Sequence, residues 1–333
     1  MAYTTIDNPE LYFNTILYTG NDGASQAQTG VGFSADLTWI KDRDNAEEHV
    51  WTDTVRGATY WIRSNATNAS ASIATLLKSW ESDGFTVGNN GVVGTTDAYV
   101  AWNWKAGGSP SSNSDGAIAT SRSLSTTAGF SIMKYTGSGS GSNIAHGLGA
   151  TPDLIIRKNI TGTEDWYVHS ILIDGSHDYF KLNTAAAKAD SGLTASTSTL
   201  IYTAADSADH IVYAFKSIQG YSKFGLYTGG NADADGPIIY TGFKPAFVLI
   251  KITAISAWII HDNKRPGYNQ TSIYSVANTT VAEPSNLGVD FLANGFKIRD
   301  SDSEVNHSGG SYIYAAFAEA PLVNSNGVPC NAR

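Results

Sequence analysis

The chain has 333 residues, a formal net charge of −9 and a single cysteine, Cys330. The acidic balance argues against a nucleic-acid partner or an anionic membrane surface, because phosphate groups are bound by basic faces. One cysteine excludes an internal disulfide framework, and no apolar stretch approaches the ~18 residues that a membrane-spanning helix needs. The first residues lack the basic-then-apolar order of a signal peptide, so we expect a protein that is made in a cytoplasm.

The first predicted element is a strand that ends in Tyr-Thr-Gly, and the same pattern returns twice. A second glycine follows each copy after 12, 12 and 13 positions; the pairs are Gly20 and Gly32, Gly137 and Gly149, and Gly229 and Gly242. An apolar segment follows each second glycine and ends on a lysine; these are Lys41, Lys158 and Lys251. Both faces of these segments are largely apolar, which predicts a strand buried between two layers.

Two more landmarks complete each copy. A tryptophan follows the lysine, namely Trp51, Trp166 and Trp258, and each copy closes on an aromatic-apolar segment at 99–105, 210–216 and 312–318. Self-similarity of this kind indicates internal repeats. We therefore predict a mainly all-β protein with three tandem β-sandwich or jelly-roll-like repeats of roughly 90 residues each, at 14–105, 129–216 and 223–318.

The remaining segments have different characters. Residues 69–80 have helical spacing, which predicts one short helix, with a strand and a loop as the alternative. Residues 106–128 are rich in Gly, Ser and Thr, which predicts a flexible linker. The ends, 1–13 and 319–333, lie outside the repeats and are predicted to be attachment segments.

Motifs of catalysis or cofactor binding are missing from the sequence. It contains no HExxH, GxSxG or GxxxxGK[ST] pattern, so we expect neither an enzyme nor a cofactor. NADADG at 231–236 resembles the start of a calcium loop, but Gly242 stands where the closing glutamate belongs, so a solvated turn is favoured. DSDSE at 300–304 places three acids on one side of an extended segment, where they would bind a divalent cation weakly or pair with a lysine. No metal site is predicted.

Aromatic side chains with polar neighbours are the candidates for a binding surface. Stacking on a ring beside a polar group is a way to hold a sugar, and the residues that fit are Trp61, Trp80, Trp166, His169, Trp258 and His261. The alternative is that the recurring tryptophans fill the core of each repeat, which the repetition itself favours, because core positions must recur for each copy to fold.

Three segments resemble a family of repeat-bearing virion proteins of marine and cyanobacterial phages, often labelled as tail fibres. They are MAYTTIDNPELYFNTILYTGN at the start, DAYVAWNWKAGG at 97–108 and AFAEAPLVNSNGVPCNAR at 316–333, and YVAWNWKAGG is the most specific of them. The second and third copies, HIVYAFK and YIYAAFA, depart from that motif. The resemblance implies a virion component and supplies no catalytic residues.

Together these observations predict a structural component of a phage virion, in a tail fibre or spike that adsorbs to the host. A capsid decoration or head fibre is the alternative, and a polysaccharide depolymerase is a third reading without motif support. The expected partners are other virion proteins, further copies of the chain in a trimer, and a glycan of the host surface. The expected location is the virion, after synthesis in the host cytoplasm.

Overall fold

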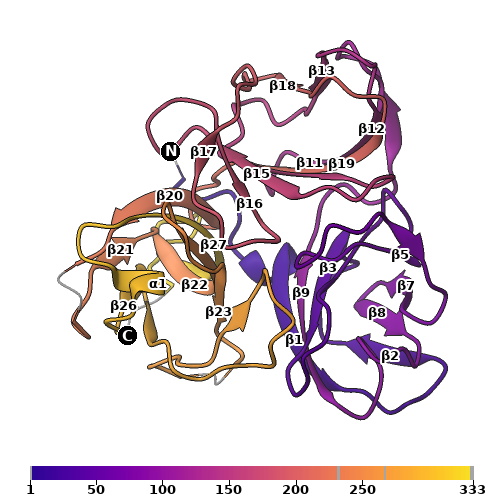
Figure 1. Ribbon diagram of the computed structural model, residues 1–333. Helices are drawn as coiled ribbons and strands as arrows, with labels where there is room; N and C mark the ends of the chain where they lie inside the picture. The colour runs from indigo at the N-terminus through magenta and orange to yellow at the C-terminus, as the bar shows by residue number, and fades with distance from the viewer. Residues whose placement is uncertain (1, 231–232, 266–267, 331–333) are drawn as a thin grey trace.

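A computed structural model describes residues 2–230, 233–265 and 268–330 of the chain. Its strands form three lobes around a common centre (Figure 1). We call the strands within residues 13–104 unit 1, those within 111–215 unit 2 and those within 222–321 unit 3. Among the described residues, no helix is long and apolar enough to span a bilayer.

Unit 1 contains a four-stranded sheet with the order β1-β9-β3-β4 and a three-stranded sheet with the order β2-β8-β7. The bounds are β1 Phe13–Thr19, β2 Gln26–Thr29, β3 Leu37–Asp42, β4 Val50–Asp53, β7 Leu77–Glu81, β8 Gly84–Val87 and β9 Ala98–Trp104. A small hairpin pairs β5 Tyr60–Trp61 with β6 Ala71–Ser72, and a 3-10 helix, η1 Pro9–Leu11, precedes β1.

Unit 2 contains an eight-stranded sheet with the order β10-β11-β12-β19-β14-β15-β16-β17 and a two-stranded sheet of β13 and β18. The bounds are β10 Ser111–Asn113, β11 Thr120–Ser125, β12 Phe130–Thr136, β13 Asn143–Ala145, β14 Leu154–Asn159, β15 Trp166–Ser170, β16 Asp178–Lys181, β17 Ala189–Asp190, β18 Leu200–Tyr202 and β19 Asp209–Phe215.

Unit 3 contains a five-stranded sheet with the order β20-β27-β22-β23-β24 and a three-stranded sheet with the order β21-β26-β25. The bounds are β20 Ser222–Thr228, β21 Ile238–Tyr240, β22 Phe243–Ile252, β23 Ile259–Asp262, β24 Ser275–Val276, β25 Val289–Leu292, β26 Gly295–Ile298 and β27 Ser311–Pro321. The short helix α1, Ser303–Asn306, lies between β26 and β27.

The large sheets share one strand order and one register. The strand carrying the lysine lies beside the closing strand in each, and the pairs are Lys41 with Val100, Lys158 with Ile211 and Lys251 with Ile313. All named neighbours in the three sheets are antiparallel. Register thus gives a common frame in which a residue of one unit can be compared with its counterparts in the other two.

Each large sheet is covered on both faces. The inner faces of all three pack together in one central core, whose largest members include Trp39, Trp102, Trp166, Tyr213 and Trp258. The outer faces pack in three separate outer cores, one for each unit, together with residues of the small sheets. Burial on both faces is the reason why the strand segments are apolar at odd and even positions alike.

Two sequence predictions are wrong at the level of local structure. Residues 69–80 form β6, a turn and the start of β7 instead of a helix, because β7 pairs with β8 in a hairpin and places Leu76 and Leu77 in the outer core. Residues 106–128 are no free linker, since β11 is hydrogen-bonded to β12 along the edge of the unit 2 sheet. Thr120 and Ser123 are buried there, and threonine in particular suits a strand.

The terminal segments are held by the chain itself. Ile6 and Phe13 belong to the central core, the Tyr3 hydroxyl donates to the carbonyl oxygen of Gly242 at 2.7 Å, and the backbone amide of Ser325 donates to the Asp7 carboxylate at 2.6 Å. Residues 2–13 are therefore part of the folded body, so the predicted attachment segment is not free in the part that the structure describes.

Candidate functional site

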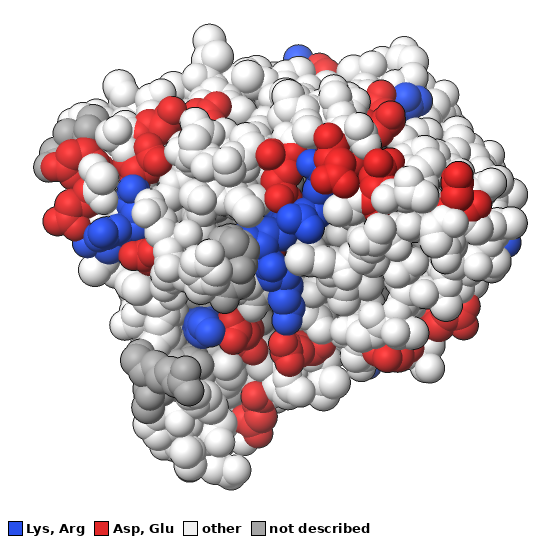
Figure 2. All heavy atoms as spheres, turned by 90° about the horizontal axis from the view of Figure 1, so that it is seen from below, with Lys and Arg blue, Asp and Glu red and all other residues white. Residues whose placement is uncertain are grey.

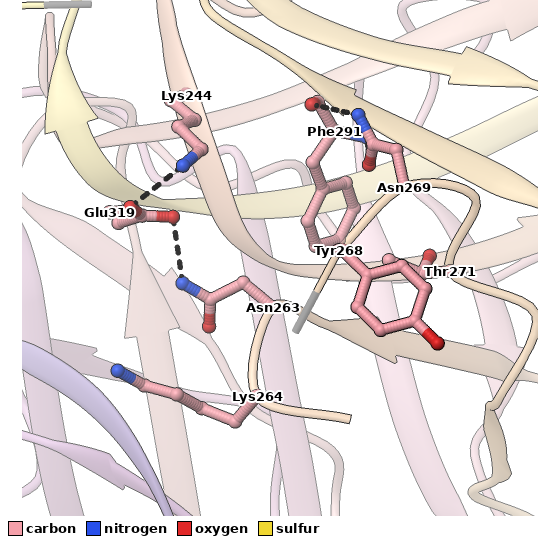
Figure 3. A pocket seen from close by; sticks show the side chains of 8 residues that line it. All are labelled: Lys244, Asn263, Lys264, Tyr268, Asn269, Thr271, Phe291 and Glu319. Carbon is pink, nitrogen blue, oxygen red and sulfur yellow. Dashed lines mark hydrogen bonds and ion pairs between the residues drawn. The ribbon is translucent and has the colours of Figure 1, made fainter. Parts of the chain in front are cut away.

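A polar groove on unit 3 is the candidate binding site (Figure 3). It has a volume of about 270 Å³ and lies among residues of β22, β25, β27 and the segment that follows β23. The residues that line it are Lys244, Asn263, Lys264, Tyr268, Asn269, Thr271, Phe291 and Glu319. Tyr268 is 74% exposed, so its ring is available to a ligand.

The polar side chains of the groove are fixed by one another. Glu319 accepts hydrogen bonds from Lys244 Nζ and from Asn263 Nδ2, each at 2.8 Å. Asn269 exchanges two hydrogen bonds of 2.8 Å with the backbone of Phe291. Asn263 Oδ1 is buried without a hydrogen-bond partner. An exposed aromatic ring beside oriented amide and charged groups is suited to binding a polar ligand such as a sugar.

The sugar-site residues proposed from the sequence lie elsewhere, inside the protein. Trp166, His169, Trp258 and His261 are at most 4% exposed, Trp61 is 8% exposed and Trp80 is half-buried. Five of the six side chains are covered by protein, so the recurring tryptophans fill the core and cannot stack on a sugar; Trp80 alone in this set is partly exposed. The groove was missed because the sequence comparison looked for rings that recur between the copies; its signal was a single aromatic residue, Tyr268, directly followed by Asn269.

The acidic motifs serve as local structure. Asp302 accepts a hydrogen bond from the Glu304 amide and caps the short helix α1, so DSDSE is not an extended segment. In NADADG, Asp235 is ion-paired with Lys297, and Asn231 lies outside the described residues. Within the described part of the chain, no group of three His, Cys, Asp or Glu side chains is placed to hold a metal ion.

The register corrects the alignment of the tryptophans. Trp51 lies opposite Trp39, and the residues in its place in units 2 and 3 are Val168 and Ile260. Trp166 lies two residues earlier, opposite Lys158, and Trp258 directly precedes β23. Their counterpart in unit 1 is His49. The backbone amides of these three residues donate to asparagine Oδ1 atoms, those of Asn65, Asn183 and Asn278.

The same three side chains link the units in a closed cycle. Each donates a ring N–H to a backbone carbonyl of another unit, and the contacts are Trp166 Nε1 to Arg63 (2.7 Å), Trp258 Nε1 to Lys181 (2.9 Å) and His49 Nε2 to Val276 (3.1 Å). The direction is unit 2 to unit 1, unit 3 to unit 2, and unit 1 to unit 3. His49 can donate because its Nδ1 accepts from Trp39 Nε1 at 2.8 Å, which leaves the proton on Nε2.

A second set of contacts between units ends on buried aspartates. Tyr213 donates to Asp53 at 2.7 Å, and Trp102 donates to Asp262 at 3.0 Å. In unit 3 the position of these two donors is occupied by Ala315, which has no polar side chain. Ala315 pairs with Leu249 in the sheet, just as Trp102 pairs with Trp39. Unit 3 thus lacks the donor, and unit 2 lacks the acceptor, since Ser170 stands at the position of Asp53 and Asp262. The donor and the acceptor of this third contact are therefore both missing.

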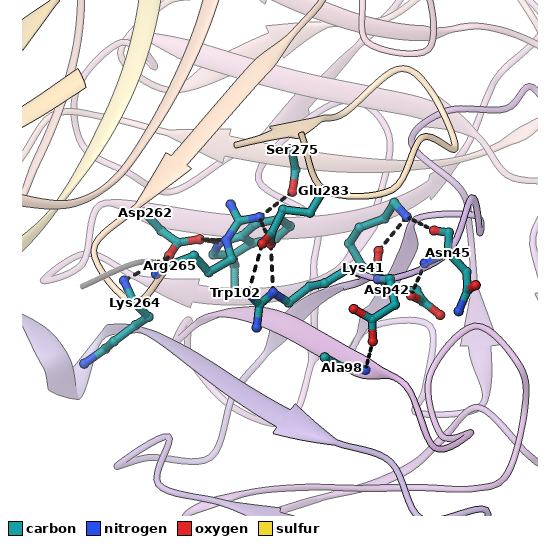
Figure 4. Close-up of polar contacts among 12 residues, drawn as sticks. Lys41, Asp42, Asn45, Ala98, Trp102, Asp262, Lys264, Arg265, Ser275 and Glu283 are labelled. Atoms are coloured by element: carbon teal, nitrogen blue, oxygen red, sulfur yellow. Dashed lines mark hydrogen bonds and ion pairs between the residues drawn. The ribbon is translucent and has the colours of Figure 1, made fainter. Parts of the chain in front are cut away.

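An ionic network joins unit 1 to unit 3 around this point (Figure 4). Glu283 binds Arg43 at 2.8 Å and Arg265 at 2.9 Å, and Arg265 also binds Asp262 at 2.7 Å. The Arg265 guanidinium lies 5.3 Å from the centre of the Trp102 ring. Burial alone would raise the pKa of Glu283, but the two arginines outweigh it and lower that pKa.

Lys41, Lys158 and Lys251 are buried at matching positions near the unit boundaries. Each donates to the carbonyl oxygen of the next residue, at 2.6, 2.6 and 2.8 Å. Lys158 also donates to the Thr67 carbonyl of unit 1 at 3.1 Å. Burial lowers the pKa of all three lysines to about 8.

These features define a β protein whose three sheets close on one core, with a polar groove on one of them. A family model described as a domain of unknown function (DUF7483) matches residues 8–321, and the chain belongs to that family. Comparison with curated proteins and with solved structures returned no match.

Proposed function

We propose that the protein is a non-enzymatic structural component of a phage virion and forms the head of a tail fibre or spike that contacts the host. The observation that carries the proposal is the cycle of ring N–H contacts from Trp166, Trp258 and His49. A body closed in this way is compact and needs no disulfide, which suits a protein that must persist outside a cell. The resemblance of YVAWNWKAGG to virion proteins supports the same role.

The proposal includes a common origin of the three units. The shared strand order, the shared register and the recurring lysines support three copies of one β unit, each with a large and a small sheet. One chain would then present an approximately threefold body of the kind that fibres and spikes build from three chains. We further propose that three copies of the chain associate as a trimer, which binds other virion proteins. Light scattering of the purified protein measures its mass and so tests the trimer.

The surface supports contact with a host glycan. On the face in Figure 2, charged side chains are scattered between broad areas of uncharged residues. The groove beside Tyr268 offers an exposed ring, amides and an ion pair on such a surface. We propose this groove, in place of the buried tryptophans, as the contact with a neutral or weakly charged sugar.

A position on the capsid is the second candidate, and the similar arrangement of the three large sheets around one core also supports it. A body with approximate threefold symmetry fits a threefold position of a lattice, where a single chain can contact three equivalent neighbours. An extended fibre shaft would instead need units stacked end to end.

Labelling intact particles with an antibody against the protein tests the proposal. Gold particles at the tail tip, together with a slower host adsorption when soluble protein is added, are the expected result. Label on the capsid would support the second candidate, and particles without label would refute both. Release of reducing ends from host polysaccharide by the purified protein would identify a depolymerase.

A further inference from the structure

The outer face of the unit 2 sheet differs in chemistry from those of units 1 and 3. Among the described residues, the outer core of unit 2 has eight buried apolar members, against fifteen in unit 1 and nineteen in unit 3. Arg157 lies on this face of unit 2, and the residues at its position in the other units are Ile40 and Ile250. The position that is occupied by isoleucine in units 1 and 3 therefore carries a guanidinium group in unit 2.

Arg157 is surrounded by aromatic and imidazole rings. Its guanidinium lies 5.5 Å from the centre of the Tyr167 ring, which lies 6.1 Å from that of His169. His169 is stacked on His177, with ring centres 4.8 Å apart and planes inclined by 10°. His169 and His177 are 4% and 8% exposed, whereas Arg157 is only half-buried, so the cluster reaches the surface at the arginine.

Several polar atoms of this cluster have no hydrogen-bond partner although they are buried. They are Arg157 Nη1, both ring nitrogens of His169 and His177 Nε2. Leaving such groups unpaired costs about 1–3 kcal/mol each, so their concentration at one place indicates a partner. Arg157 supplies a positive charge and N–H donors, and each neutral imidazole can supply one N–H. His177 supplies it from Nε2 when its Nδ1 accepts from the Ser191 hydroxyl, which lies 2.8 Å away.

Acidic side chains near this face are already engaged or lie on the other side of the sheet. Asp178 has the strand parity of Phe180, which packs in the central core, and it binds Lys188 at 2.9 Å. Asp206 binds His210 at 2.8 Å, and Glu164 accepts from Asn159 at 2.8 Å. A charged partner for Arg157 would therefore come from outside the chain.

We propose that Arg157, His169 and His177 form a binding site for an oxyanion, either the carboxylate of an acidic sugar or inorganic phosphate. The guanidinium pairs with the oxyanion at the surface end, and the stacked imidazoles donate to it from within. The site lies on unit 2 and is separate from the groove on unit 3. Its existence does not depend on the proposed virion role.

Calorimetric titration of the full chain with phosphate, with glucuronate and with glucose tests the site. We expect saturable one-to-one binding of one or both anions and none of glucose. A preference for glucuronate identifies an acidic sugar, and a preference for phosphate identifies the inorganic ion. Absence of saturable binding by either anion would overturn the proposal and leave ordered water as the partner of the cluster.

Variants assign the binding to these residues. Arg157→Ile places the residue of unit 3 at this position, so it should fold, and we expect it to weaken anion binding by about tenfold or more through loss of a charge-assisted hydrogen bond. His169→Thr, which places the residue of unit 1, should weaken binding by a smaller factor. His261→Thr is the matched control, because His261 has the position of His169 in unit 3, and it should leave affinity unchanged.

Two outcomes of the variant series contradict the proposal. Equal affinity in wild type and Arg157→Ile would place the anion elsewhere, and equal losses in His169→Thr and His261→Thr would indicate a general effect on the fold. Should Arg157→Ile fail to fold, Arg157→Lys keeps the charge without the planar fork. Side-chain NMR of His169 then decides, because a bound anion must shift its ring nitrogens in the wild type and shift them less in Arg157→Lys.

Discussion

The central core and the outer cores differ in the side chains that they contain, although the same alternating strands supply both. The central core collects large aromatic side chains from all three units, and four of them, Trp102, Trp166, Tyr213 and Trp258, donate to partners in another unit. The outer cores each belong to one unit and differ in size, from nineteen buried apolar residues in the described part of unit 3 to eight in unit 2. The central core thus holds the units to one another, whereas each outer core packs within one unit, and in unit 2 the outer face carries a charged side chain, Arg157, at a position that is apolar in the other two.

The largest expected effect comes from breaking the central core. Trp102→Ala removes a fully buried ring and its hydrogen bond to Asp262, and we expect a loss of about 3–5 kcal/mol in the free energy of unfolding. Trp80→Ala is the comparison, since that ring is half-buried beside the unit 1 outer core and should cost clearly less. Urea denaturation of both variants measures the difference, and equal losses would contradict the distinction between the cores.

Removal of a buried aspartate at the unit boundary should cost nearly as much. Asp262→Ala leaves Arg265 and Trp102 without their shared acceptor, and breaking a buried ion pair in this way costs about 3 kcal/mol or more. Asp209→Ala breaks the partly exposed pair with Lys134, which should cost less than about 1 kcal/mol. Thermal unfolding compares them, and a similar shift for both would show that the boundary aspartate is dispensable.

The cycle between units can be opened at one contact by replacing an indole with a phenyl ring. Trp258→Phe loses the donor to the Lys181 carbonyl, and we expect a loss of about 1–2 kcal/mol. Trp51→Phe is the matched control, because Trp51 Nε1 is buried without a partner. Both variants lose the same ring volume from the central core, so chemical denaturation should show a smaller loss for Trp51→Phe than for Trp258→Phe; an equal or larger loss for Trp51→Phe would mean that ring volume, and not the hydrogen bond, holds the units.

The smallest effect is a dependence on pH. Lys41, Lys158 and Lys251 have pKa values lowered to about 8 from 10.5, so the unfolded chain binds more protons than the folded one between those values. Stability from these groups therefore rises as pH increases from about 8 toward 10. Lys251→Met should reduce the slope of the urea midpoint against pH, because it removes one of the three buried groups. An unchanged slope in Lys251→Met would indicate that the buried lysine keeps its ordinary pKa.

Strands could be predicted from the sequence where the pattern of apolar residues was clear, and each wrong prediction has a physical cause. The segments around Lys41, Lys158 and Lys251 are strands with both faces buried, as their apolar runs predicted. Residues 69–80 were mispredicted because hairpin pairing overrode a helical spacing. The tryptophan alignment was wrong because composition was compared without register, and the functional equivalent of two tryptophans is a histidine, His49.

The sequence by itself determined the β character, the recurring lysines and the apolar inner strands, since these depend on neighbours along the chain. Tertiary structure alone decided that Trp166 donates to a carbonyl about a hundred residues away, that Tyr268 lines a groove, and that Arg157 lies over the ring of Tyr167. Such contacts depend on which faces meet when the three sheets pack, and residues on one face are not neighbours in the sequence. The pattern of a strand indicates which side chains are buried and which are exposed, but only the packed fold determines which residue each buried side chain contacts.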